Sequence, residues 1–103
     1  MFYKVMIVHY IADFILQTRW MGENKSKNII ALLTHIGVYT LALMLFGFKF
    51  ALVNGFIHFG VDFITSRLSS YAYKNNNMEL FWAIIGLDQL LHVLTLFATL
   101  TLI

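Results

Sequence analysis

The fold is decided by residues 50–71, which read FALVNGFIHFGVDFITSRLSSY. At a rise of 1.5 Å per residue, this mostly apolar stretch is long enough for a helix that crosses the roughly 30 Å hydrocarbon core of a bilayer. Asn54, His58 and Asp62 recur at every fourth residue, so they lie on one face of such a helix. The stretch therefore predicts a membrane-spanning helix with a single polar stripe.

Composition extends this prediction to the whole chain. Of the 103 residues, 60% are hydrophobic and 12% are charged, and the mean hydropathy is +0.78. Soluble domains carry about 25% charged residues, so the composition excludes a soluble globule. Three further apolar stretches, residues 2–18, 28–46 and 79–102, are also long enough to span a membrane. Because the connections are short, we expect a single domain over residues 1–103, an all-α four-helix transmembrane bundle with antiparallel neighbours.

Basic residues predict the orientation of this bundle, since Lys and Arg in short loops stay on the cytoplasmic side. Of the seven basic residues, only Lys4 and Lys49 lie on the side opposite the connections 19–27 and 73–78. We therefore expect these two connections to be cytoplasmic and both termini to be non-cytoplasmic. The net charge is only +2 and the basic residues form no run, so we expect no nucleic-acid partner.

Polar residues at helical spacing occur in every predicted span. Besides the stripe in residues 50–71, the other spans contain His9, Asp13 and Gln17, then His35 and Tyr39, and finally Asp88 and His92. All four histidines and all three aspartates of the chain lie in predicted spans. A charge at the centre of a bilayer costs roughly 2.5–3.5 kcal/mol, so such residues usually face a bundle interior and serve a function. We expect the four stripes to converge on one shared pocket.

An internal repeat supports this arrangement. Residues 9–15 (HYIADFI) and residues 58–64 (HFGVDFI) share the pattern His-x-x-x-Asp-Phe-Ile. Duplication of a two-helix hairpin would explain this match. It predicts a bundle built from two repeated helical hairpins, related by an axis along the membrane normal, with a pseudo-symmetric site between them.

Separated residues over nearly the whole chain also agree in order with one known family. They are His9, Asp13, Phe14, Gln17, Thr18, Asn24, Lys25, Leu33, His35, Tyr39, Asn54, His58, Asp62, Asp88, Gln89 and His92. By these residues the chain resembles domain of unknown function family 3307, which consists of small integral membrane proteins of bacteria and phages. The resemblance implies a four-helix architecture in a bacterial-type inner membrane and importance for the His and Asp positions, but no activity. A more distant likeness, in residue types alone, is to membrane-bound metal-dependent hydrolases.

The His and Asp residues predict a divalent metal site, because imidazole and carboxylate groups at helical spacing are typical metal ligands. Zn is favoured, and Mn, Fe or Mg are alternatives, since the chain has no Cys. Seven candidate ligands exceed the four that one Zn requires. Either two ions share the site, or some groups act as general base or orient the ligands. We assign metal binding to His9, Asp13, His58, Asp62, Asp88 and His92, and general-base catalysis to His35 or Asp88.

Four polar residues are candidates for binding a substrate: Arg19 and Arg67, which end their spans near the predicted cytoplasmic mouth, and Gln17 and Gln89. Arginine can clamp a phosphate or a lipid headgroup, although arginines at span ends also anchor helices. The glutamines can bond a ligand or simply pack. The leading hypothesis is a metal-dependent hydrolase that acts on a lipid-linked or phosphorylated substrate, with membrane lipids as its partners.

Two other functions stay open. A transporter or channel for protons or metal ions would use the same polar groups, although the stripes fade toward the non-cytoplasmic side. A small regulatory membrane protein would use them only as a structural polar core, because membrane helices do bond through His, Asn and Thr. Ala51 and Gly55 form a small pair that favours close helix approach, either within the chain or between copies in a homo-oligomer.

Overall fold

The chain is all-helical, as the sequence predicts. The computed structural model describes residues 2–103, with residues 22 and 23 as backbone only, and no strand occurs in this part of the chain. Its α-helices are α1 (Phe2–Tyr10), α2 (Arg19–Asn24), α3 (Ile29–Leu43), α4 (Phe48–Lys74) and α5 (Met78–Ala98). A π-helical turn, Ile11–Ile15, continues α1, and short 3-10 turns follow α3 at Met44–Phe46 and α5 at Leu100–Leu102.

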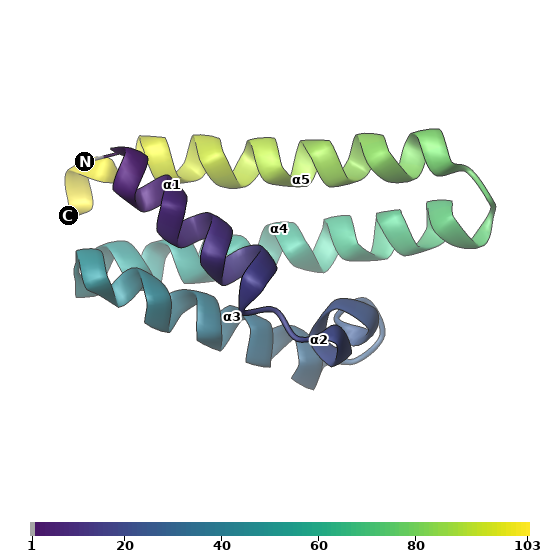
Figure 1. Ribbon diagram of the computed structural model, residues 1–103, viewed down its shortest axis with the longest axis horizontal. Helices are drawn as coiled ribbons and strands as arrows, with labels where there is room; N and C mark the ends of the chain where they lie inside the picture. The colour runs from purple at the N-terminus through teal and green to yellow at the C-terminus, as the bar shows by residue number, and fades with distance from the viewer. Residues whose placement is uncertain (1) are drawn as a thin grey trace.

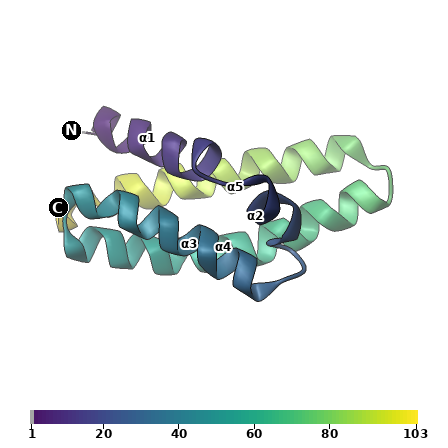
Figure 2. The ribbon, with the colours of Figure 1, turned by 60° about the horizontal axis from the view of Figure 1, so that its bottom comes forward.

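The two longest helices, α4 and α5, form the frame of the molecule. They run side by side in opposite directions along the long axis (Figure 1). The 27 residues of α4 correspond to a length of about 40 Å, and the molecule extends 41 Å along this axis. In Figure 2, α3 lies along the first half of α4, while α1 runs above them. Both termini lie at the same end as the turn between α3 and α4 (Figures 1 and 2).

Turn residues explain where the long helices begin and end. Gly47, between α3 and α4, has a φ of 122°, which residues with a Cβ rarely adopt. Between α4 and α5, Asn76 has a φ of 56°, in the left-handed region that Asn tolerates better than most residues. Asn77 then caps α5, because its side chain accepts a hydrogen bond from the backbone N–H of Leu80. These turns lie at the connections that the sequence predicts.

The first predicted span, residues 2–18, differs most from the observed helices. The backbone N–H of Leu16 donates to the carbonyl of Ile11 at 2.8 Å, a five-residue step that defines the π turn. The helix ends at Ile15, and the predicted polar connection 19–27 contains α2, whose N-cap is the Thr18 side chain. The sequence repeat pairs α1 with α4, but α1 is short and continues into a π turn, whereas α4 is a long regular helix. The two halves of the chain therefore differ in structure.

Many ionisable side chains are buried and many large apolar side chains are exposed. All four histidines and all three aspartates are buried. In contrast, large apolar side chains on α3, α4 and α5 are exposed, among them Leu41 at 70%, Phe56 at 81% and Trp82 at 64%. The interior thus contains the groups that water solvates best, and the surface contains groups that water solvates poorly.

The small pair Ala51 and Gly55 is used within the chain. Both residues are buried in the described structure, and a Cβ on Gly55 would collide with the hydroxyl group of Thr40 on α3. The pair therefore allows α3 and α4 to approach closely, which is one of the two arrangements that the sequence left open.

Two helical segments are long and apolar enough to cross a membrane. They are Ile29–Phe46 and Met78–Ala98, of which 28% and 22% are buried inside the molecule. By length and composition these segments agree with two of the predicted spans, 28–46 and 79–102.

Candidate metal centre

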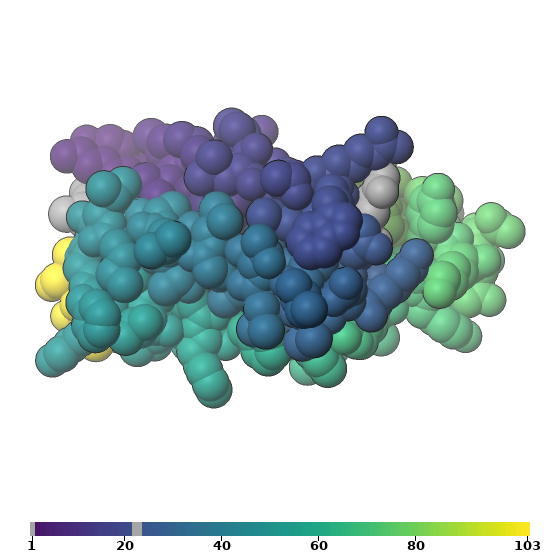
Figure 3. Space-filling model, turned by 90° about the horizontal axis from the view of Figure 1, so that it is seen from below, coloured from purple at the N-terminus to yellow at the C-terminus, as the bar shows by residue number. Residues whose placement is uncertain are grey.

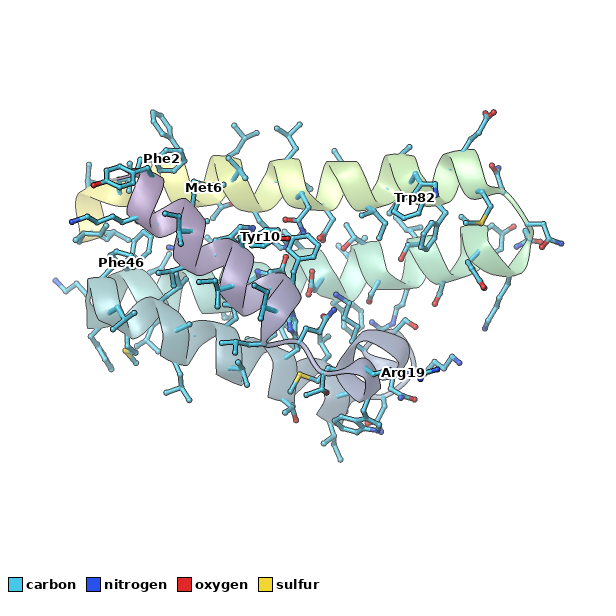
Figure 4. The ribbon with its side chains drawn as sticks, viewed as in Figure 1. Phe2, Met6, Tyr10, Arg19, Phe46 and Trp82 are labelled. Atoms are coloured by element: carbon cyan, nitrogen blue, oxygen red, sulfur yellow. The ribbon has the colours of Figure 1, made fainter. Side chains whose placement is uncertain are left out.

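Four side chains from three parts of the chain meet in the interior. Nε2 of His35, on α3, lies 3.1 Å from Oδ1 of Asp13 and 3.1 Å from Oδ2 of Asp62. Nε2 of His58, on α4, lies 3.4 and 3.2 Å from the same two oxygens, and the two nitrogens are 3.2 Å apart. Figure 4 shows nitrogen and oxygen atoms in the interior near the end of α1. The sequence predicts this convergence of residues from separate helices.

Local structure explains why these four residues meet. His58 and Asp62 are four residues apart on the regular helix α4, so both face α3. Asp13 lies within the π turn and its side chain is buried, while the next residue, Phe14, is exposed. His35 is fully buried on α3, at 0% exposure.

The distances fit a tetrahedral metal site. Zn binds imidazole nitrogen and carboxylate oxygen at about 2.0–2.2 Å, and a tetrahedron with such bonds has edges of about 3.3–3.6 Å. Five of the six separations among the two nitrogens and two oxygens are 3.1–3.4 Å, and all four ligand atoms lie within 4.8 Å of one another. A group of this composition, Asp13, His35, His58 and Asp62, could hold a metal ion. We call these four residues the primary donor group.

A second group lies directly beside the first. Nε2 of His92, on α5, is 3.1 Å from Oδ1 of Asp62 and 3.2 Å from Oδ1 of Asp88. Asp13, Asp88 and His92 could together hold another ion, and we call them the secondary donor group. Asp13 belongs to both groups, and Asp62 contacts His92 through its other oxygen, so the two groups would hold their ions close together.

His9 occupies a different position from the one its spacing suggested. Its Nδ1 lies 2.8 Å from the hydroxyl of Tyr39, and its Nε2 lies 3.1 Å from Oε1 of Gln89. The amide nitrogen of Gln89 donates to Oδ2 of Asp13 at 2.7 Å and to Oδ2 of Asp88 at 3.2 Å. His9 thus contacts the donor groups through Gln89, whereas His35, which the sequence suggested as a base, lies in the primary donor group.

The candidate substrate residues lie apart from one another. Gln17 accepts a bond from Lys25 at 3.2 Å, and Gln89 bonds the aspartates as described above. Arg67 donates to the carbonyl of Phe63 at 2.8 Å, and its guanidinium carbon lies 3.7 Å above the Phe63 ring. Arg19 is the first residue of α2 and is labelled in Figure 4. Gln17 and Gln89 are thus connected to the donor groups, Gln17 through Lys25.

Sequence reasoning assigned Lys25 only to the orientation of the chain, but its ammonium group reaches the primary donor group. Nζ of Lys25 lies 3.5 Å from Oδ2 of Asp62. The two residues are 37 positions apart, and Lys25 follows directly after α2. No periodic signal could have paired them, because the contact depends on how the segment 19–27 folds back toward α4. One ammonium offsets one of three buried carboxylates. The imidazoles of His35, His58 and His92 also pair with these carboxylates and offset their charge when protonated.

Apolar side chains close the interior at the end where the termini lie. Val5, Leu43, Phe50 and Leu96 are buried there in one hydrophobic cluster. They come from the start of α1, the end of α3, the start of α4 and the end of α5. The polar interior therefore ends at an apolar layer on this side.

These features define an all-α protein with a buried His/Asp cluster that has the composition of a metal site. The chain belongs to the family described as Protein of unknown function (DUF3307), which matches residues 1–103. This confirms the resemblance seen in the sequence, over the whole chain. Neither a curated protein nor a solved structure matches the chain.

Proposed function

We propose that this protein binds a divalent metal ion in the primary donor group and uses it for hydrolysis within a membrane. The observation that carries the proposal is the convergence of four lone-pair atoms, two Nε2 and two Oδ, at separations of 3.1–3.4 Å. Two carboxylates and two imidazoles at this spacing form an electron-rich centre that a cation stabilises. A buried carboxylate without such compensation would be strongly destabilising.

The donor set favours Zn, with Mn, Fe or Mg as alternatives. Two nitrogens and two oxygens suit borderline and harder ions, and no thiolate is present to favour Cu(I). In a one-ion site, Asp88 and His92 lie outside the primary donor group and would act as the acid–base pair. In a two-ion site, they would bind the second ion. Four protein ligands fill a tetrahedral site, so a catalytic water would have to replace one of them or add a fifth ligand. The ion would then lower the pKa of that water to near neutrality.

We further propose that the chain is a four-helix transmembrane bundle. The exposed apolar side chains on α3, α4 and α5 support this proposal, because contiguous apolar surface of this extent calls for lipid or another protein. The buried polar core supports it as well, since ionisable residues in membrane proteins face the interior. Asp13 and Asp62, which are equivalent in the sequence repeat, both approach the imidazoles of His35 and His58. His9, the repeat equivalent of His58, bonds Tyr39 and Gln89 instead.

An enzyme fits the interior better than a channel does. A conducting path would need polar groups toward both ends, whereas Val5, Leu43, Phe50 and Leu96 form an apolar layer at one end. At the other end, Lys25 connects the donor group to the surface.

Element analysis of the purified protein tests the metal site. We expect about one tightly bound divalent ion per chain, or about two if both donor groups are filled. Chelation should lower the thermal stability, and Zn should restore it. Protein that contains no metal, and whose stability chelator and added ions leave unchanged, would show that the cluster is only a structural polar core.

A further inference from the structure

A cavity of about 660 Å³ lies beside the metal centre, within the 300–1,000 Å³ typical of ligand sites. It is formed by the segment 17–27, the last turns of α4 and the first turns of α5. In Figure 3 the segment around α2 lies between α1 and the far ends of α4 and α5. We call this cavity the basic pocket, after its lining residues Lys25, Lys27 and Lys74.

The polar lining of the basic pocket suits an anion. Its described lining contains these three lysines and four serines, and no carboxylate. The Ser66 side chain is 6% exposed, and its hydroxyl is buried without a hydrogen-bond partner among the described residues. A buried hydroxyl that lacks a partner is costly, and a ligand in the pocket would bond this one once the side chains that cover it move.

The opposite wall of the basic pocket is apolar. Phe81 and Ile85, both on the first half of α5, line it. A ligand that fills the pocket would therefore have a charged group near the lysines and an apolar part along α5. Three ammonium groups and several hydroxyls match the many acceptor oxygens of a phosphate group, since charge-assisted bonds to phosphate are strong.

Lys25 connects the basic pocket to the metal centre. Lys25 is one of the lining residues of the pocket, and its ammonium group contacts Oδ2 of Asp62 at 3.5 Å and Oε1 of Gln17 at 3.2 Å. A phosphate bound to Lys25 would thus lie next to the primary donor group. We propose that the basic pocket binds the phosphate group of a lipid, and, resting on the proposed hydrolase function, that this phosphorylated lipid is the substrate class.

Titration of the full chain in phosphatidylcholine nanodiscs tests this inference. The probes are dihexanoyl phosphatidic acid, dihexanoyl phosphatidylcholine and inorganic phosphate. We expect phosphatidic acid to bind best, and Lys27→Gln and Lys74→Gln each to weaken its binding about tenfold. Ser66→Ala should weaken it as well. Lys49→Gln removes the same charge at the opposite end of α4 and is the matched control, which should bind as the unaltered chain does.

The outcomes separate the two proposals. Equal binding of inorganic phosphate and phosphatidic acid would assign the pocket to free phosphate and overturn the lipid assignment. If phosphatidic acid does not bind, the pocket proposal is overturned. The same follows if Lys27→Gln and Lys74→Gln weaken its binding no more than Lys49→Gln does. The metal content is measured on the same samples. Metal present without phosphatidic acid binding refutes only the basic pocket, whereas phosphatidic acid binding without metal refutes only the metal centre and the hydrolysis that depends on it.

Discussion

Replacement of His35 by Gln is the sharpest test of the primary donor group. His35 is fully buried. Its Nε2 lies within 3.2 Å of the other three donor atoms of the group, which belong to Asp13, His58 and Asp62. Loss of an outer partner of a metal ligand typically costs 10–100-fold in affinity. Loss of a direct ligand should cost at least the upper end of that range, so we expect the Zn affinity of His35→Gln to fall at least about 100-fold.

This loss translates into thermal stability. At a free Zn concentration 100 times its dissociation constant, the ion adds about 2.7 kcal/mol to the stability of the folded state. After a 100-fold loss of affinity the same Zn adds only about 0.4 kcal/mol. For a domain of about 100 residues, the difference of about 2.3 kcal/mol corresponds to a melting temperature lower by roughly 10–20 °C.

Thermal unfolding with and without chelator measures this effect. Asn54→Ala is the control, because Asn54 is equally buried on α4, at 2% exposure, and lies outside both donor groups. We expect Asn54→Ala to keep the full stabilisation by Zn even if its metal-free form is less stable. The reasoning is refuted if His35→Gln and the unaltered chain gain the same stability from Zn. His58→Gln provides a second measurement should His35→Gln fail to fold.

Three other predictions concern the fold and the membrane. The chain has no Cys, so Met78→Cys and Lys49→Cys each introduce a single thiol. A membrane-impermeant thiol reagent should modify Met78→Cys from the cytoplasmic side and Lys49→Cys from the opposite side. Labelling of both from the same side would contradict the transmembrane arrangement. Asn77→Ala removes the cap of α5 and should lower the free energy of unfolding by about 1 kcal/mol, a loss that Asn77→Ser should largely prevent if capping is the cause. Gly55→Val should destabilise the protein because a side chain there collides with Thr40, and an unchanged melting temperature would show that α3 and α4 are not held in close contact.

Spacing within a helix carries information that a sequence reveals directly. His58 and Asp62, or Asp88 and His92, must share a face once the segment is helical, because four residues make about one turn. The cost of burying ionisable groups among apolar residues then predicts that these faces point inward. The all-helical class, the turns at Gly47 and at residues 75–77, and the burial of all seven His and Asp side chains could all be predicted on these grounds.

Which side chains of neighbouring helices contact one another depends on how each helix is rotated about its axis and shifted along it. The spacing of residues within a helix does not specify this. Asp13 lies within the π turn Ile11–Ile15 and contacts His35 and His58, and no residue pattern predicted this turn. For the same reason the sequence could not tell that His35 would join the primary donor group while His9 would bond Tyr39 and Gln89.

The basic pocket is the clearest example of an arrangement that depends on packing and not on spacing within a helix. Its lysines and serines looked like ordinary loop and helix-end residues, since Lys25 and Lys27 also satisfy the charge bias of a cytoplasmic loop. Only the folding of segment 17–27 against the ends of α4 and α5 places them around one cavity. The residue types and their spacing thus predicted which chemical groups this protein has in its interior. Which residues contact one another depends on packing between the helices, because contacts between residues far apart in the sequence form only when the helices assemble.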